Sequence, residues 1–467
     1  MIRRFRFASV SYPLFFCCLL ILVSACTGLP GSGSGGKSTP TATGGNATPG
    51  SGATSTPVLQ TVPMPATQTA CPDANTARAA VIRPLLLGQL QNLVYIYNEV
   101  PQNTSTAIGH LRRYDVSNGH KAEIVSSGIR IDQAQISADG QWVLFVSIPD
   151  PRSDPQHSAL LQLVRMDGTG LQTLYCFPTT PYPDATHGTE LPIAVQWSVD
   201  QKSILISVNT GKTSATSQVF LLDVASGSLH QLFQDQNDAS FYYSAVTWLD
   251  NTRFYIIKRG LSAPTPPATV YLMDASKATL ASPGLTPVLT TSTRQSYYSL
   301  DSSYDGTLLY SSYCLLAGSP FSTNIQVGPA AGGSRHAIFQ EQPHDCIETM
   351  RAVSSSTLLM LMEVGNSSGS GFKNEIWTMN LLGNSTRSLA TLTSPDSGNT
   401  GYRLNPSSQF PWSNVSRDNG FYAVQAIDPI ATNQTIFVSS LKGGDLTAVA
   451  VTNPGSSSVS LAGWTTL

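Results

Sequence analysis

The sequence predicts an all-β fold, a seven-bladed β-propeller built of four-stranded blades. Its apolar segments are short, rich in Val, Ile, Leu, Tyr and Phe, and broken every few residues by Gly, Pro, Asn, Asp or Ser, which is typical of strands joined by turns. One unit of such strands recurs along the chain, as expected for a repeat architecture. The last recurrence stops at the C-terminus, and its missing strands stand at the other end of the folded part.

The clearest repeat covers residues 136–174. Asp139-Gly140 lies between two apolar segments, and Asp167-Gly168 precedes a third. Asp-Gly between apolar segments predicts a tight hairpin, because the favoured turns need a positive φ, which Gly and Asp tolerate. The repeat therefore predicts four short strands in succession, each antiparallel to the one before.

The same order of a dipeptide, a polar turn and an apolar second strand recurs along the chain. We place the inner-strand starts at Ile136-Ser137, Trp197-Ser198, Trp248-Leu249, Ser303-Tyr304, Val353-Ser354, Val415-Ser416 and Trp464-Thr465. The second strands are predicted at residues 142–146, 204–208, 254–257, 308–311, 358–362 and 421–424. The seventh dipeptide has no second strand after it.

The two ends of the folded part complete each other. Residues 93–97, 111–114 and 122–125 have the form of second, third and fourth strands without a first. A C-terminal strand at 460–467 supplies that first strand, and this closure removes the sheet edges that an open array would expose. We therefore predict that the last strand of the chain pairs with the segment at 93–97.

The N-terminus is predicted to be a targeting segment. Arg3, Arg4 and Arg6 precede a short apolar core at 13–23, and Val-Ser-Ala leads directly to Cys26. Charge, an apolar run and then small residues form the secretory pattern. The small residues before Cys resemble the lipobox of bacterial lipoproteins, which implies cleavage before Cys26 and a diacylglyceryl group on its sulfur. An ordinary signal peptide and an uncleaved anchor are the alternatives.

Composition divides the chain into four parts. Residues 1–25 are the predicted signal peptide. Residues 26–70 begin with the lipidated Cys26 and continue with Gly, Ser, Thr, Pro and Ala, which cannot bury a core and predict a flexible tether. A lead at 71–88 precedes the propeller at 89–467. This layout predicts a protein of the cell envelope, anchored by lipid to the extracytoplasmic side of the cell membrane.

Charge limits the partners. Charged residues make up 12% of the chain, with 26 Lys and Arg against 28 Asp and Glu. A nucleic-acid partner would need a concentrated basic surface, and none is present beyond the signal, so no nucleic-acid binding is expected. We expect a monomeric ring.

The repeat resembles that of the TolB-type, WD40-like β-propellers of exported bacterial proteins. The resemblance covers residues 89–467 and rests on the Ser-x-Asp-Gly turn between two strands and on the later Asp-x-x-x-Gly hairpin. The Pro that usually follows Ser in that family is replaced by Ala138, Val199 and Arg417. The resemblance implies the fold. It does not select a function, because this fold carries binding scaffolds, lyases and lactonases.

No motif specifies a reaction. Residues 365–369 match G-x-S-x-G, but they lie between two predicted strands rather than on a strand-to-helix elbow, and no catalytic residue is predicted. The seven His residues are scattered and no C-x-x-C pair occurs, so neither a metal site nor a cofactor is predicted. The acids at 301–306 and 235–238 are expected to form turns rather than calcium loops.

Four cysteines remain outside the signal and the lipid site, and an even number in an exported protein favours disulfides. Cys314 ends a predicted second strand and Cys346 follows the fourth strand of the same blade, so both lie at one face and we pair them. Cys176 ends a fourth strand and is then paired with Cys71 of the lead. Free buried thiols are the alternative.

The loops between second and third strands and the loops between blades share one face of a propeller. Several long loops that carry aromatic residues are predicted there, and aromatic rings beside a few polar groups suit peptide or carbohydrate recognition. The candidate ligand residues are Tyr182, His187, Glu190, Phe241, Tyr242, Tyr297, Tyr298, Tyr402 and Arg403. Packing of these rings beneath the loops is the alternative.

Two classes of function remain open. The first is a non-enzymatic binding or scaffolding propeller for an envelope protein, a peptide or a glycan. The second is a lactonase-like or lyase-like enzyme with a metal at the mouth of the central channel. The second class needs convergent acids, His or a metal, whereas the residues around the inner-strand starts are mainly Ile, Val, Ser, Trp and Gln. We therefore favour the first.

Overall fold

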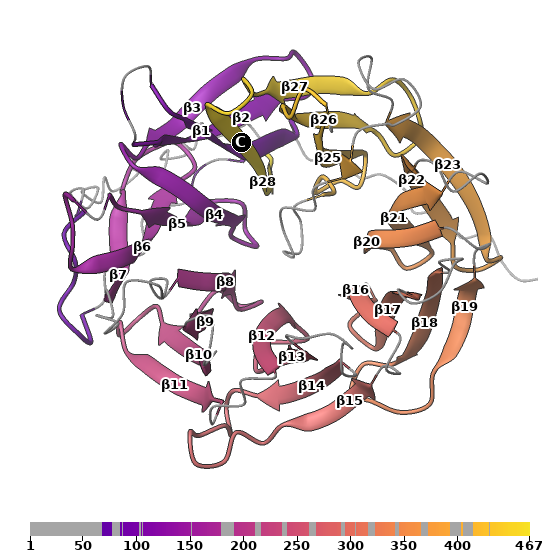
Figure 1. Ribbon diagram of the computed structural model, residues 1–467, viewed down its shortest axis with the longest axis horizontal. Helices are drawn as coiled ribbons and strands as arrows, with labels where there is room; N and C mark the ends of the chain where they lie inside the picture. The colour runs from indigo at the N-terminus through magenta and orange to yellow at the C-terminus, as the bar shows by residue number, and fades with distance from the viewer. Residues whose placement is uncertain are drawn as a thin grey trace, which may run out of the picture. The chain divides into compact units, whose positions relative to one another are not determined.

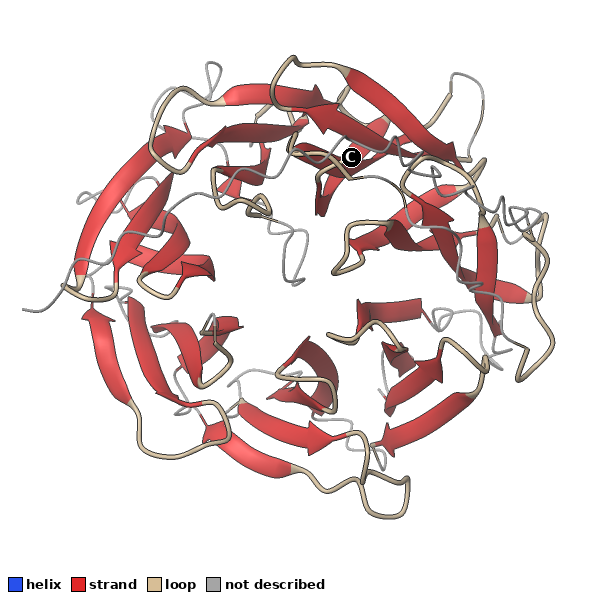
Figure 2. Cartoon of the chain, turned by 180° about the vertical axis from the view of Figure 1, so that it is seen from behind, coloured by secondary structure: helices blue, strands red, loops and turns tan. Residues whose placement is uncertain are grey.

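The part of the chain that the structure describes belongs to one compact unit, Thr61–Leu467. The computed structural model describes residues 68–76, 85, 87–101, 104, 106–150, 152–178, 191–210, 216–235, 241–260, 268–290, 295–303, 305–315, 323–340, 345–365, 372–392, 403–404, 414–428 and 430–467. Every regular element in these ranges is a β-strand, as Figure 2 shows. No helix that could cross a membrane is found within them.

The strands form seven four-stranded antiparallel sheets arranged in a ring (Figure 1). We number these sheets as blades in chain order and name their strands from the centre outwards. Blade 1 holds β28 (Ser457–Thr465), β1 (Asn92–Glu99), β2 (Ile108–Asp115) and β3 (Lys121–Ser126). Blade 2 holds β4 (Arg130–Ile136), β5 (Trp142–Ile148), β6 (His157–Arg165) and β7 (Gln172–Pro178). Blade 3 holds β8 (Leu191–Trp197), β9 (Ser203–Thr210), β10 (Thr216–Asp223) and β11 (Leu229–Gln234).

The other four blades follow the same plan. Blade 4 holds β12 (Phe241–Trp248), β13 (Arg253–Gly260), β14 (Thr269–Asp274) and β15 (Thr286–Thr290). Blade 5 holds β16 (Gln295–Ser302), β17 (Leu308–Leu315), β18 (Thr323–Pro329) and β19 (His336–Gln340). Blade 6 holds β20 (Asp345–Ser354), β21 (Thr357–Gly365), β22 (Phe372–Asn380) and β23 (Ser385–Leu392). Blade 7 holds β24 (Arg403–Leu404), β25 (Phe421–Ile427), β26 (Gln434–Ser440) and β27 (Thr447–Val451).

The predicted seven-bladed propeller and its closure by the C-terminus are confirmed. β28 pairs antiparallel with β1, with Trp464 opposite Leu93, so the last strand of the chain completes the first blade. All six predicted second strands fall within observed ones. The C-terminal strand begins at Ser457, earlier than the predicted 460.

The hydrophobic core lies between the blades rather than within one centre. Seven clusters of buried side chains fill the seven junctions between neighbouring blades. At the junction of blades 7 and 1, the fully buried Trp464 packs in one cluster with Tyr95, Ala423 and Ile436. Burial of such side chains stabilises a fold by about 1.5–3 kcal/mol each. Closure of the ring therefore has the same apolar basis as every other junction.

A serine and an aspartate build the turn between the first and second strands. The Ser137 hydroxyl donates to Asp139 Oδ1 at 2.6 Å and accepts the amide N–H of Trp142 at 3.0 Å. The same two bonds recur at Ser198, Ser303 and Ser416. The residue after the aspartate has a positive φ in all four turns, at Gly140, Gln201, Gly306 and Asn419. The turn thus forms without the Pro that the resembling family carries.

The dipeptides that we set as inner-strand starts are wrong in direction, because they are strand ends. β4 ends at Ile136 and β8 ends at Trp197, and the turn follows directly. The inner strand before Ile136 is not an apolar run, since four of its seven residues are polar or charged. Its polar residues hid it from the hydrophobic pattern. The dipeptides therefore mark the face of the propeller that carries the first-to-second strand turns.

Candidate functional site

A cavity of about 580 Å³ lies where the inner strands of blades 2 to 6 end. The ends of β4, β8, β12, β16 and β20 line it, together with the turns that follow several of them. In Figure 1 these strands surround the centre of the ring. The cavity is therefore the mouth of the central channel on the face of the first-to-second strand turns, and we call it the mouth cavity.

The mouth cavity is lined by both apolar and polar residues. Trp197 and Trp248 line it while remaining largely buried, at 7% and 6% exposed. Val199, in the turn after β8, lines the same cavity and is 53% exposed. Small polar residues add hydroxyl and amide groups at Ser198, Asn251, Ser302, Ser303 and Asn419. Such a mixture of apolar surface and a few polar groups is typical of ligand sites.

A buried ion pair crosses the cavity wall between blades 5 and 6. Asp301 at the end of β16 is 4% exposed, and its carboxylate accepts Arg351 Nη1 at 2.9 Å and the Ala352 amide at 2.7 Å. Burial raises the pKa of Asp301, and the charge of Arg351 opposes that rise. Our expectation that Asp301 forms a turn was wrong, because it lies within a strand and binds the next blade.

Two glutamines do similar work at neighbouring junctions. The Gln135 side-chain oxygen accepts the Trp197 amide at 2.7 Å, which joins blades 2 and 3. Gln196 Nε2 donates to the Val246 carbonyl at 2.5 Å, which joins blades 3 and 4. The polar side chains near the channel therefore fix one blade to the next, as buried polar groups must find partners.

The other two acids of the cavity belong to turns. Burial opposes the charged form of Asp250, but hydrogen bonds from Thr252 and Arg253 outweigh it and lower its pKa. Hydrogen bonds from Ser303 and Thr307 lower the pKa of Asp305 to about 2. The prediction that acids here serve as turn formers holds for Asp305.

The predicted ligand residues do not meet at the mouth cavity. Tyr182, His187, Glu190 and Tyr402 lie outside the described residues. The other five were expected in loops, but they lie in inner strands: Phe241 and Tyr242 in β12, Tyr297 and Tyr298 in β16, and Arg403 in β24.

Among these five, the side chain of Phe241 is the one that the structure describes. Phe241 begins β12 at the end opposite to Trp248. Lys258 Nζ lies 3.9 Å from the centroid of its ring. The expectation that this ring lies in a loop was wrong, because β12 starts earlier than the apolar pattern indicates. The sequence does single out the cavity residues Trp197 and Trp248, but it marks them as repeat positions and not as part of a site.

The lead is fixed to blade 2 by the expected disulfide. Cys71 and Cys176 are bonded, with their Cα atoms 5.8 Å apart. Cys346 is also disulfide-bonded, and it lies in β20 rather than in a connection after β19. The side chain of Cys314 lies outside the described residues, so its pairing with Cys346 stays a prediction.

Similar solved structures share the fold. One is an oligogalacturonate lyase in complex with manganese, with 9% identity, a TM-score of 0.51, and coverage of 76% of this chain and 98% of that one. Another is an oligogalacturonate lyase from Vibrio parahaemolyticus, with 10% identity, a TM-score of 0.50 and the same coverage. TolB from Acinetobacter baumannii matches with 13% identity, a TM-score of 0.39, and coverage of 75% and 78%.

These likenesses define the class of protein and no more. No family model matches the sequence, and no curated protein matches it. At about one identical residue in ten, the lyase matches show the fold alone. The described chain is a seven-bladed, all-β propeller.

The described residues that line the mouth cavity offer few metal ligands. Among the described residues, one group of His, Cys, Asp or Glu brings three ligand atoms close together, and it lies at Cys71, not at the mouth. Asp301 has both oxygens in hydrogen bonds, and among the described residues that line the cavity none is a histidine. The donor set differs from that of usual transition-metal sites.

Proposed function

We propose that this protein is a non-enzymatic binding propeller of the cell envelope, which holds a peptide segment of an envelope protein, or a glycan, in the mouth cavity. The observation that carries the proposal is that the three aspartates of the mouth cavity form hydrogen bonds that hold the fold together. Asp301 binds Arg351 and Ala352, while Asp250 and Asp305 hold their own turns. A general acid or base must have a proton-transfer partner in the substrate, and these carboxylates already serve the fold.

The mouth cavity has the features of a binding site without the need for acid–base catalysis. Val199, which is 53% exposed, supplies apolar surface beside the largely buried Trp197 and Trp248, and the serines and asparagines of the rim supply hydrogen bonds. Apolar surface with a few polar groups is what peptide and sugar ligands need. The ligand face that we expected from the sequence is the opposite one, so the proposal moves the site to the turn face.

The proposal also includes the location of the protein in the cell. A lipid on Cys26 and the tether up to residue 70 would hold the ring near the outer side of the cell membrane. A short anchor of this kind raises the local concentration of envelope partners, because tethering makes the second encounter intramolecular. A weak site at the mouth would then suffice for occupancy.

Tryptophan fluorescence tests the proposal. The purified full chain is titrated with two probes, muropeptides released from peptidoglycan and a proteolytic digest of envelope proteins. We expect a saturable change with one of them in wild type and in the control W377F, whose indole lies in β22 and donates to Glu375. The W197F/W248F double variant, folded by circular dichroism, should show no change. An unchanged response in that variant, or no saturable response to either probe, would overturn the proposal.

The enzyme alternative is separated in the same samples. Mass spectrometry of the bound fraction should recover the probe intact. Metal analysis of the purified chain should find no stoichiometric calcium, zinc or manganese. Accumulating product, or one equivalent of metal that is lost on changing Asp301, would favour the enzyme instead.

A further inference from the structure

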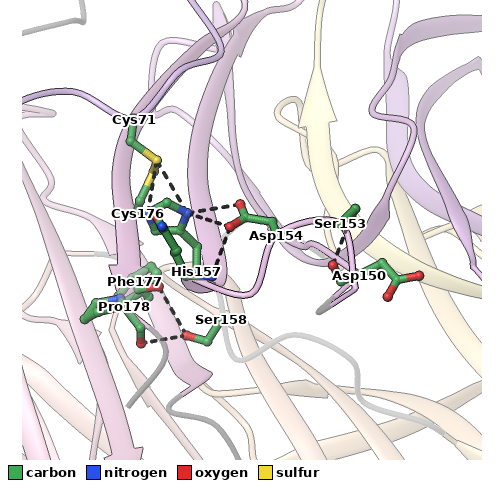
Figure 3. A network of polar contacts seen from close by, with 10 residues as sticks. Cys71, Asp150, Ser153, Asp154, His157, Ser158, Cys176, Phe177 and Pro178 are labelled. Atoms are coloured by element: carbon green, nitrogen blue, oxygen red, sulfur yellow. Dashed lines mark hydrogen bonds and ion pairs between the residues drawn. A yellow bond between two sulfur atoms is a disulfide. The ribbon is translucent and has the colours of Figure 1, made fainter. Parts of the chain in front are cut away.

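We infer that Cys71, Cys176 and His157 form a binding site for a divalent zinc ion once their disulfide is reduced. Figure 3 shows these side chains together at the edge of blade 2. Cys176 lies in β7, the outermost strand, His157 begins β6 beside it, and Cys71 belongs to the lead. One ligand atom from each residue lies within 4.8 Å of the others. Two thiolates and one imidazole are a common zinc donor set.

The distance between nitrogen and sulfur already suits a metal. His157 Nε2 lies 3.6 Å from Cys71 Sγ. A tetrahedral zinc with bonds of about 2.0 Å to nitrogen and about 2.3 Å to sulfur separates these two atoms by about 3.6 Å. Nδ1 of His157 lies 4.0 Å from the same sulfur, so the ring must rotate before the lone pair of Nε2 can reach a metal beside Cys71. The two sulfurs must separate from bonding distance, which rotation of their side chains allows.

A carboxylate orients the histidine as in known metal sites. Nδ1 of His157 lies 3.0 Å from both carboxylate oxygens of Asp154. A hydrogen on Nδ1 then points at the carboxylate, which leaves Nε2 with the free lone pair that a metal would use. Carboxylate partners of this kind fix the tautomer of metal-binding histidines and raise their basicity. Asp154 would thus be a positioning residue, and water would complete the four ligands.

Backbone hydrogen bonds keep the site together without the disulfide. Gln68, in the segment just before the lead, forms a parallel bridge with Gln172 of β7, and the Thr173 amide donates to the Gln68 carbonyl at 2.9 Å. The Thr173 hydroxyl donates to the Thr69 carbonyl at 2.7 Å. The chain therefore lies along blade 2 just before Cys71. Cys71 is exposed, and Cys176 and His157 are partly exposed, so a reductant and a metal ion both reach them.

Opening of the Cys71–Cys176 disulfide requires a two-electron reductant, such as a dithiol. The dithiol gives two electrons and two protons to the Cys71–Cys176 bond and becomes a disulfide itself. Zinc then binds both sulfurs and releases their two protons, because thiolates are the ligands. The oxidised chain holds the lead by a covalent bond, and the reduced chain holds it by the metal. The lead would stay attached to blade 2 in both redox states.

Cobalt absorption tests this site. The full chain carries C17S, C18S, C26S, C314S and C346S, so that Cys71 and Cys176 are the remaining cysteines. It is reduced with a phosphine, desalted without oxygen and titrated with Co²⁺. We expect one equivalent to give the visible bands of tetrahedral cobalt with thiolate charge transfer, and zinc to displace it. The oxidised sample should give no such bands.

Three variants make the test specific. H157A should lose the tetrahedral bands, and D154N should weaken cobalt binding about 10–100-fold, as for other partners of metal-binding histidines. H230A, which replaces an exposed histidine of β11, should bind as the parent does. Absence of tetrahedral bands in the reduced parent, equal bands in H157A, or loss of the folded circular dichroism spectrum on reduction would each overturn the inference.

Discussion

The guanidinium of Arg417 donates Nη2–H to the carbonyl of Ser137 at 2.8 Å, although the two residues are 280 positions apart. Arg417 lies in the first-to-second strand turn of blade 7, and Ser137 lies in that of blade 2. The same guanidinium donates to the carbonyls of Ala138 and of Trp464, the latter in β28 of blade 1. One side chain thus joins three blades where the ring closes, and its burial lowers the pKa of Arg417.

Replacing Arg417 should weaken the closure. R417A removes three charge-assisted hydrogen bonds and leaves their carbonyls without donors, so we expect a loss of about 2–4 kcal/mol in the free energy of unfolding. Urea unfolding followed by circular dichroism measures it. R130A, which removes an exposed arginine paired with Asp132, is the control and should cause no measurable change. Equal stability of R417A and wild type would show that the closure depends on β28 alone.

Gly168 should tolerate no side chain. It lies in the β6–β7 turn of blade 2 with φ of 84°, and an added Cβ would overlap the carbonyl oxygen of Ile124 in blade 1. G168A should therefore lose about 3–5 kcal/mol, from left-handed strain and from the clash. Gly284 is the matched control, because its φ is 62° and nothing lies within 4 Å of an added Cβ. G284A should lose about 1–2 kcal/mol. Equal losses in urea unfolding would contradict the packing at this junction.

The turn aspartates should make the ring sensitive to acid. The pKa of Asp305 falls from its ordinary value of 3.8 to about 2 in the folded protein, because Ser303 and Thr307 donate to it. A carboxyl with a lowered folded pKa stabilises the fold above its unfolded pKa and loses this effect as the pH falls through the folded one. The window is therefore about pH 4 to pH 2.

Two variants assign that acid sensitivity. The melting temperature of wild type should exceed that of D305N at pH 5, and the difference should shrink as the pH falls to 2. S303A removes the hydroxyl that lowers the pKa of Asp305 most and should show a smaller pH-dependent difference of the same sign. Thermal unfolding by circular dichroism in steps of pH measures both. A difference that stays constant with pH would count against the lowered pKa.

Cys26 should determine where the protein resides. C26S removes the sulfur that the lipid would occupy, so we expect the chain to move from the membrane pellet to the soluble extracytoplasmic fraction. Cell fractionation with detection of a C-terminal tag measures this. C346S is a control that leaves the anchor intact. Retention of C26S in the pellet after a salt wash would contradict lipid anchoring.

The sequence was sufficient for the number of blades and for the closure of the ring. Short apolar segments and the Ser-x-Asp turns repeat with the blade, because each blade buries the same strands against its neighbours. The inner strands were harder to find, since residues such as Gln135 face the channel and bind the next blade. The inner strands therefore end where the apolar pattern predicts that they start.

The mouth cavity could not be derived in the same way. Asp301 and Arg351 are 50 residues apart and meet only because blades 5 and 6 are neighbours in the ring. The cluster around His157 likewise needs the lead to return beside β7. A pairing of this kind depends on three-dimensional packing, which local sequence patterns do not encode. The Cys71–Cys176 pair could be predicted from the sequence, because four cysteines allow few possible pairings.

Site-specific photo-crosslinking in the native envelope tests the central claim, that the mouth cavity binds an envelope ligand. A photo-reactive amino acid replaces Val199 at the rim, or Leu382, which is 86% exposed in the β22–β23 turn of blade 6. We predict a discrete adduct at Val199 that W197F/W248F abolishes, and none at Leu382. Equal adducts at both positions, or an adduct at Val199 that the double variant retains, would contradict the account.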